Sequence, residues 1–400
     1  MRVHLVAALL SCLVLGTSRA ADNGKHVSDE KRLYNDLLAN YNKYVRPSNA
    51  SHDKVTVKFG VSLMDIIAVN EAEGTLVTQL WFNQLWNDAG LKWDPAEYYG
   101  VTAIRIPASK LWTPDIVLFN PAEATSFLQD VLAVVYHTGD VLWIPPAIVK
   151  SRCAMDMTYF PHDTQNCLLK FGSWSYDGYQ VDPQFYEDRK EVVTDDYIPD
   201  MEWDLVDTSA RRYEMYYPCC SEPYPNLSFN ISIARKNSLY SVIMVTPYVF
   251  LALLSPIVFL FPFSETQRFS LGGSILICLV FMLCTFGNAV PLTMGRLPLI
   301  AQYYTSIFIL LSLSMIFSAV ILNMADRKSP PPRILKLILV DGLAFILCVP
   351  RDTDEKPIQS DAEDNTGDWK VMARALDRLC FLVYVVVTVC LTLACLSQGS

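Results

Sequence analysis

Six side chains between Phe269 and Gly295 have types and spacing that indicate a function. At helical spacing they form one stripe, polar at both ends and apolar in the middle: Ser270, Ser274, Ile277, Phe281, Cys284 and Asn288. The stretch is uncharged and long enough to cross a bilayer, which takes roughly 20 residues. Such a stripe suits a helix lining a water column that an apolar ring closes. The alternative is an ordinary span with small residues for helix packing.

The rest of the chain divides into two halves of different composition. It has 400 residues, of which 52% are hydrophobic, and a formal net charge of -9. The first half is mixed and rich in aromatic residues, whereas the second holds three long uncharged runs, an acidic insert and a fourth run. The length suits about two domains. The acidity argues against nucleic acid as a partner and is compatible with attracting cations.

Residues 1–20 have the features of a cleavable secretory signal: a basic tip, a short apolar core and a small-x-small end. The chain up to the first apolar run is therefore expected to be extracellular, where disulfides form and sequons are glycosylated. Three asparagines begin such sequons: Asn49, Asn226 and Asn230.

The extracellular half changes its hydrophobic period near residue 50. Apolar residues at helical spacing predict a helix from Ser28 to Val45, before Pro47. Short alternating runs then continue to about residue 233, separated by Gly, Pro, Asn and Asp turns, and predict a β-sandwich. The predicted fold is an extracellular all-β, immunoglobulin-like sandwich with an N-terminal helix, followed by an all-α four-helix transmembrane domain.

Four cysteines lie in the extracellular half beyond the signal, and they permit three disulfide connectivities. Cys153 and Cys167 enclose thirteen residues, a loop short enough to close well. Cys219 and Cys220 would then bond to each other, although adjacent Cα atoms lie only about 3.8 Å apart. Two crossing bridges between the pairs remain the alternative.

An enzyme is disfavoured because the chemistry-bearing motifs are missing from the sequence. It has no Gly-rich phosphate loop, no G-x-S-x-G and no His pair at metal-ligand spacing, so we expect no catalysis, no cofactor and no metal. A G-protein-coupled receptor would need seven spans. A secreted ligand-binding pentamer would not need residues 239–400.

Several unusual motifs occur together and in order. Cys153 and Cys167 enclose Phe160, Pro161 and Asp163, YPCCSEPY occupies residues 217–224, and apolar runs follow. From about residue 26 onward, the chain resembles the Cys-loop pentameric ligand-gated channels, and within them α-type nicotinic acetylcholine receptor subunits of the self-assembling kind. The resemblance implies an extracellular ligand-binding domain at 21–236, three transmembrane helices at 237–324, an intracellular loop at 325–370 and a fourth transmembrane helix at 371–400.

The resemblance also implies an agonist site between two subunits. Aromatic faces recognise quaternary ammonium ions. The principal face would comprise Phe119, Trp174, Tyr217, Cys219, Cys220 and Tyr224. The complementary face would comprise Trp81, Val134, Leu142 and Ile144. Phe119 stands where the family usually has Tyr, so one hydroxyl is lost. Because one chain carries both faces, the expected assembly is a homopentamer opened by a small quaternary-ammonium or amine agonist.

For gating, the resemblance implies contacts at the base of the sandwich. Phe160, Pro161 and Asp163 would touch the loop from Pro291 to Pro298. Glu71 would pair with a basic residue, either Arg235 or Lys236.

In the pore, Ile277 and Phe281 would form the closed gate. Gln267 and Asn288 replace carboxylates that cation channels usually place at the two mouths, and Glu265 is a candidate substitute. Anion-selective relatives insert Pro-Ala before the pore helix's basic residue, and PFSETQR lacks that insert. We therefore expect permeant cations. An anion channel and an auxiliary or orphan-ligand subunit are the alternatives.

The remaining segments fit a multi-pass protein among membrane lipids. Residues 329–347 resemble a short helix on the cytosolic membrane face, and residues 351–368 read as a polar, acidic, unstructured stretch. The expected location is the plasma membrane, such as a postsynaptic one, with four spans and both termini extracellular. The six remaining mature cysteines would be free thiols.

Overall fold

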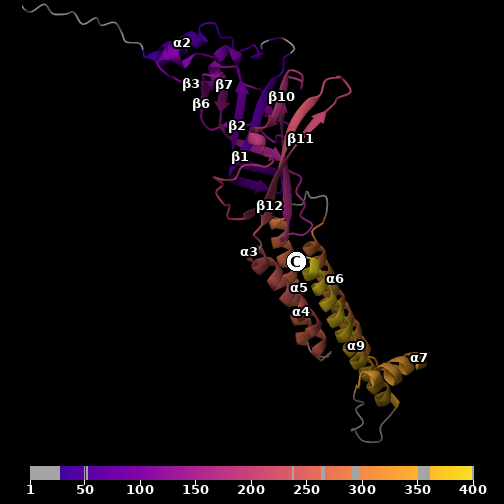
Figure 1. The fold of residues 1–400 in the computed structure, drawn as a ribbon. Coiled ribbons are helices and arrows are strands. Elements are labelled where there is room, and N and C mark those ends of the chain that lie inside the picture. Colours follow the sequence, from indigo (N-terminus) through magenta and orange to yellow (C-terminus); the bar gives the residue numbers. More distant parts are fainter. Residues whose placement is uncertain are drawn as a thin grey trace, which may run out of the picture.

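The computed structural model describes residues 28–48, 50, 53–236, 238–262, 266–290, 297–349 and 361–398. The molecule is elongated, with a β-rich half at one end and a bundle of long helices at the other (Figure 1). The strand β12 descends to the junction between the halves, where the helical region begins. The prediction of a β-sandwich followed by four apolar helices is confirmed.

The first sheet has eight strands in the order β10-β1-β2-β7-β6-β3, with β8 pairing to both β2 and β5. Side chains of β1 alternate inward and outward, with Val57, Phe59 and Val61 buried. The strands are β1 (Val55–Asn70), β2 (Thr75–Asn87), β3 (Ala103–Pro107), β5 (Ser126–Phe127), β6 (Leu132–Tyr136), β7 (Asp140–Trp143), β8 (Pro146–Arg152) and β10 (Val181–Phe185).

The second sheet has four strands in the order β11-β12-β9-β4 and packs its inner face against the first. Phe171 on β9 and Phe229 on β12 contact Phe59 across the core, with ring centroids 5.0 and 6.1 Å apart. Such ring pairs add to the hydrophobic stabilisation of the buried core. The strands are β4 (Ile116–Leu118), β9 (Thr164–Ser173), β11 (Trp203–Met215) and β12 (Tyr224–Arg235).

The N-terminal helix is shorter than predicted, since α2 spans Asp29–Leu38 and does not continue to Val45. Ser28 caps it as expected, accepting a hydrogen bond from the Lys31 amide. Beyond the helix the chain turns so that the Tyr41 hydroxyl donates to Asp88, 2.6 Å away. This tertiary contact, and the turn-favouring Asn40 and Asn42 on either side of Tyr41, end the helix although the apolar residues continue at helical spacing.

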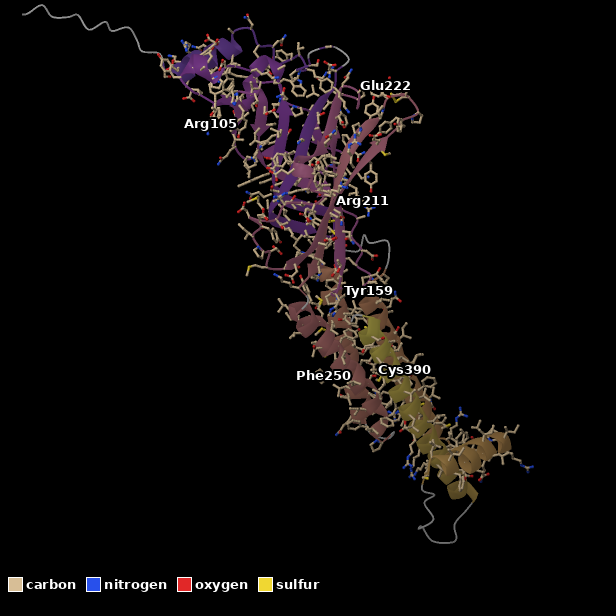
Figure 2. All side chains as sticks on the ribbon, in the orientation of Figure 1. Arg105, Tyr159, Arg211, Glu222, Phe250 and Cys390 are labelled. Carbon is tan, nitrogen blue, oxygen red and sulfur yellow. A yellow bond between two sulfur atoms is a disulfide. The ribbon has the colours of Figure 1, made fainter. Side chains whose placement is uncertain are left out.

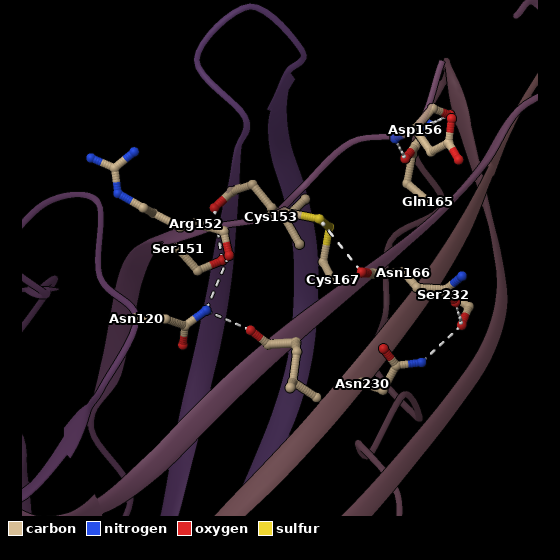
Figure 3. Close-up of a disulfide and its surroundings, with 12 residues drawn as sticks. Asn120, Ser151, Arg152, Cys153, Asp156, Gln165, Asn166, Cys167, Asn230 and Ser232 are labelled. Carbon is tan, nitrogen blue, oxygen red and sulfur yellow. Dashed lines mark hydrogen bonds between the residues drawn. A yellow bond between two sulfur atoms is a disulfide. The ribbon is translucent and has the colours of Figure 1, made fainter. Parts of the chain in front are cut away.

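Both disulfides follow the non-crossing connectivity, with Cys153 bonded to Cys167 and Cys219 bonded to Cys220. Figure 3 shows the Cys153–Cys167 bridge between the end of β8 and β9. Beside it, the Asn120 side-chain amide donates to the carbonyls of Arg152 on β8 and Leu168 on β9. The disulfide and the Asn120 side chain therefore both link β8 to β9. The six other described cysteines are free.

In the described part of the helical half, four helical segments are long and apolar enough to cross a membrane: 242–260, 266–288, 299–325 and 367–395. The first is interrupted near Pro247 and Pro256, where proline removes backbone donors. It consists of α3 (Ser238–Tyr240), a π-helix (Ser241–Val245), α4 (Thr246–Leu254) and a 3₁₀ helix (Ser255–Leu260). The other long helices are α5 (Thr266–Ala289), α6 (Leu299–Ala325) and α9 (Asp361–Gln398).

The segment between α6 and α9 contains α7 (Arg333–Lys336), a π-helix (Leu337–Leu343) and α8 (Ala344–Ile346). This short helical unit packs Val340 and Ala344 against Trp369 of α9. We expected residues 351–368 to be unstructured, but α9 already begins at Asp361, so that expectation is wrong for 361–368. Packing of the neighbouring turn around Trp369 extends the helix against the polar composition.

Asp182 ties the two sheets together through charge. Its carboxylate accepts from Lys54 at 2.9 Å and from Arg212 of β11 at 2.8 Å. Burial alone would raise the pKa of Asp182, but the hydrogen bonds from Lys54, Gln184 and Arg212 outweigh it and lower the pKa.

We expect Asp182→Asn to lower the melting temperature at neutral pH and to change its pH dependence. A depressed folded-state pKa stabilises the fold above the unfolded value of about 3.9, and this contribution is lost as the pH falls below it. The difference in melting temperature between the two proteins should therefore be constant near pH 7 and shrink below about pH 4. A difference independent of pH would contradict this role of the carboxylate.

Candidate functional site

Two exposed aromatic rings lie side by side at the edge of the second sheet. Phe119 follows β4, and its amide donates to the Lys170 carbonyl of β9, while Trp174 directly follows β9. Their ring centroids are 6.3 Å apart. Trp174 is 73% exposed and Phe119 36%, although large aromatic rings are usually buried. An exposed pair of this kind is a ready surface for a cation or an apolar partner.

The β11–β12 hairpin carries the other residues predicted for the principal face. Tyr217 and Tyr224 lie on either side of the Cys219–Cys220 bridge with ring centroids 5.4 Å apart. Figure 2 shows Glu222 at the tip of this hairpin, which projects from the sandwich. The bridge joins two adjacent residues of the loop that connects the strands; Tyr217 lies in this loop, and Tyr224 is the first residue of β12.

Sequence reasoning missed the residues that position this aromatic face. The Asp115 side chain accepts from the Ser173 hydroxyl and the Ser175 amide, while its carbonyl accepts from the Trp174 amide at 3.2 Å. A Cβ at Gly172 would lie 2.7 Å from the Phe119 ring, so only glycine allows the ring to rest on β9. Asp115 lies in the WTPDIVLFN stretch, and in the sequence nothing distinguishes it from any other polar residue that precedes a strand.

The predicted complementary residues share one face of the first sheet. Leu142 on β7 pairs with Val134 on β6 and with Leu85 on β2. Directly opposed residues lie on the same side of a sheet and successive even steps return to it, so Trp81 and Ile144 lie on that face too. Trp81 is 37% exposed, and the three aliphatic residues are half-buried. The hairpin belongs to the second sheet, so the predicted principal and complementary residues lie on different sheets of the chain.

At the junction with the helices, Arg235 is the centre of a charge cluster. Its buried guanidinium contacts Asp163 at 2.8 Å, Glu71 at 2.8 Å and Glu202 at 3.0 Å. Lys236 instead contacts Asp204, so Arg235 and not Lys236 is the partner of Glu71. Burial lowers the pKa of Arg235, but its bonds to Asp163 and Glu71 outweigh this and raise the pKa above its usual range. Glu202 was not anticipated from the sequence.

The disulfide loop reaches the helices from this cluster. The Phe160 ring, preceding a cis bond to buried Pro161, packs on Tyr240 at 5.5 Å and on Phe286 of α5 at 6.2 Å. The Leu299 amide at the start of α6 donates to the Thr158 carbonyl. Tyr159 lies at the same junction in Figure 2. Residues 291–296 of the predicted contact loop lie outside the described residues. Phe286 and Leu299 come before and after this segment in the sequence, and both contact the disulfide loop.

The predicted stripe on α5 is exposed along its whole length in the single chain: Ser270, Ser274, Ile277, Phe281, Cys284 and Asn288. Ile277 is 71% and Phe281 68% exposed. The opposite face is buried in the bundle through Arg268, Ile275, Leu279 and Phe286. The helix thus keeps its inner face for its own subunit and leaves the polar–apolar–polar face uncovered. Gln267 is exposed, whereas Glu265 lies outside the described residues.

The candidate glycosylation sites differ in placement. Asn226 is buried on β12, and the Asn230 amide donates to the Ser232 hydroxyl at 3.0 Å within the same strand. Acceptor asparagines usually lie on surface loops, whereas both of these lie on the strand β12, Asn226 buried and Asn230 half-buried. Asn49 lies outside the described residues. Among the described residues, no group of three or more His, Cys, Asp and Glu is arranged to hold a metal ion.

Comparison with known proteins agrees with both halves of this architecture. The neurotransmitter-gated ion-channel ligand binding domain profile matches residues 30–237, and the neurotransmitter-gated ion-channel transmembrane region profile matches residues 244–366. The chain belongs to the neurotransmitter-gated ion-channel family. The β-sandwich is accordingly the extracellular part of a multi-pass plasma-membrane protein, and the family is one of channels rather than a class of enzymes.

Its similar relatives within the family are acetylcholine receptor subunits. Acetylcholine receptor subunit alpha-L1 of Schistocerca gregaria is 42% identical over 308 residues, which are 75% of this chain and 55% of the relative. Acetylcholine receptor subunit alpha-like 2 of Drosophila melanogaster is 39% identical, covering 79% and 57%. Neuronal acetylcholine receptor subunit alpha-2 of Mus musculus is 35% identical, covering 82% and 63%. The chain thus spans little more than half the length of these relatives.

We expect Arg235→Gln to destabilise the protein strongly, by about 3–5 kcal/mol, because it leaves the buried Asp163 carboxylate without its countercharge. Thermal unfolding of the purified protein measures the effect. Lys236→Gln is the matched control, since Lys236 is more exposed and pairs with exposed Asp204, and its loss should cost about 1 kcal/mol or less. Equal losses for the two variants would contradict the assignment of Arg235 as the central cation.

Proposed function

We propose that this chain is a subunit of a pentameric cation channel that opens when acetylcholine or a related amine binds between subunits. The observation that carries the proposal is the placement of two aromatic pairs at neighbouring strands of the second sheet: exposed Phe119 with Trp174, and exposed Tyr217 with half-buried Tyr224. A quaternary ammonium ion has no proton to donate, so its recognition depends on ring faces. The relatives named above are acetylcholine receptor subunits of the α type.

The proposed site is completed by a second copy of the chain. Trp81, Val134, Leu142 and Ile144 share an outward face of the first sheet, away from the hairpin that carries Tyr217. In a ring of identical subunits, each hairpin faces the next copy's Trp81 face, so every interface contains a whole site. Rings arise when a head-to-tail interface closes on itself. We therefore propose a homopentamer.

The proposed conduction path follows the exposed stripe of α5. Rings of Ile277 and Phe281 would exclude water at the gate, while serine hydroxyls and Asn288 would face the water on either side. The boundaries proposed for the domains are those of the sequence prediction, apart from the earlier start of α9.

The decisive experiment is expression of this chain alone in oocytes under voltage clamp, with acetylcholine, choline and a panel of amines. We expect an agonist-evoked current whose reversal potential follows sodium. A reversal potential that follows chloride would overturn the cation assignment. Surface protein without any evoked current would overturn the proposal of an amine-gated homomer.

We expect Trp174→Ala to raise the half-maximal agonist concentration about 30-fold. Loss of a desolvated cation–π contact costs about 2 kcal/mol, and 1.4 kcal/mol corresponds to a factor of ten. Concentration–response curves provide the measurement. Tyr44→Ala removes another highly exposed ring from the sandwich and should leave the curve unchanged. Equal sensitivity of the two variants would rule out Trp174 as the recognition face.

We expect Ile277→Ser to give channels that leak without agonist, because a hydroxyl wets the apolar ring that holds the pore closed. Holding current before agonist application measures the leak. Val280→Ser is the matched control, since Val280 is exposed on α5 but lies off the stripe. If the leak follows Val280→Ser instead, the pore faces a different side of the helix.

A further inference from the structure

The helix α5 carries one charged residue, Arg268, and its position bears on ion selectivity. The side chain is completely buried, although the flanking Gln267 and Ser270 are exposed. At about 100° per residue, the nine-residue step from Arg268 to Ile277 places the two about half a turn apart around the helix. Arg268 therefore points away from the stripe and into its own subunit.

Each of the three guanidinium nitrogens has a hydrogen-bond partner there. Its two terminal nitrogens donate to both carboxylate oxygens of Asp377 on α9, at 2.9 and 2.7 Å. Its Nε donates to the Ser318 hydroxyl of α6 at 3.0 Å. Its Cζ lies 5.1 Å from the centroid of the Phe259 ring, which belongs to the first span. All four spans thus meet at one cation. Such bidentate geometry is stronger and more directional than a single contact.

We propose that Asp377 is a specificity-determining positioning residue, which keeps the charge of Arg268 out of the conduction path. This rests on the proposed function, in which the exposed stripe of α5 faces the pore. A positive ring at the cytosolic mouth would repel cations and attract anions. Asp377 both neutralises this charge and holds it in the bundle. The exposed residues described at this end of α5 are then all uncharged: Thr266, Gln267 and Ser270.

The ion pair between Arg268 and Asp377 also lowers the free-energy cost of placing a charged side chain in a transmembrane segment. An ionised side chain in a transmembrane segment is expensive unless it is paired within the bundle. Removal of one partner leaves the other charge buried and uncompensated, whereas removal of both charges relieves the penalty. In the proposed assembly, an uncompensated Arg268 would be relieved by turning toward the water of the conduction path.

The test compares Asp377→Asn with the double variant Arg268→Gln/Asp377→Asn. We expect Asp377→Asn to shift the reversal potential toward chloride and to lower inward sodium conductance about twofold or more. The double variant, which has no cation to release, should recover both. Asp368→Asn is the matched control, since Asp368 lies on α9 but pairs with Lys336. Measurement on an Ile277→Ser background removes the need for an agonist. Wild-type selectivity and conductance in Asp377→Asn would overturn the proposal.

Thermal unfolding of the purified proteins provides a readout independent of channel activity. Asp377→Asn should lower the melting temperature by several degrees, and the double variant should recover it, whether or not an agonist is known. If the wild-type channel gives no current but the melting temperatures follow this pattern, the proposed function is contradicted and the ion pair between Arg268 and Asp377 is supported. A melting temperature for Asp377→Asn equal to that of Asp368→Asn would overturn the ion pair itself.

Discussion

A single buried guanidinium, that of Arg235, connects the two halves of this chain. It ends β12, lies against Trp203 at 4.3 Å, and contacts three carboxylates from three separate segments. An ion in such a site is stable only while its partners are in place. The disulfide loop, the β1–β2 turn and the entry to the first span are therefore held in one mutual arrangement. The strand β12 runs without interruption from the hairpin to this cluster.

From the cluster to the helices, the contacts pass through aromatic rings. Phe160 touches Phe286 of α5, Phe286 lies 5.3 Å from Tyr304 of α6, and Tyr304 stacks on Tyr248 of α4 at 3.5 Å. Packed side chains cannot deform continuously, so a shift at one end is transmitted as a change between discrete arrangements. Tyr303 hydrogen-bonds Thr392 and so includes α9 in the same cluster. At the other end of the bundle, Arg268 joins the same four spans through charge.

Periodicity allowed much of this to be predicted, and its limits explain the rest. Alternation along β1 and the stripe on α5 are local patterns, so the sandwich and a helix with a polar–apolar–polar face could be predicted from the sequence. The family resemblance left both Arg235 and Lys236 as candidate partners for Glu71, since the choice depends on which face of β12 meets the β1–β2 turn. Glu202, Asp115 and Asp377 were missed because their partners are distant in the sequence or defined only by packing. Ends of helices were predicted poorly where a tertiary contact, such as that of Tyr41 with Asp88, overrides helical spacing.

The central claim is that neighbouring copies of this chain complete both the aromatic site and the pore. Electron cryomicroscopy of the chain expressed alone, with a quaternary-ammonium agonist bound, tests it most directly. The account predicts a pentameric ring with ligand density between the Trp174 face of one copy and the Trp81 face of the next. It also predicts that Ile277 and Phe281 line the axis. A monomer, or a ring in which ligand density lies elsewhere, would contradict it.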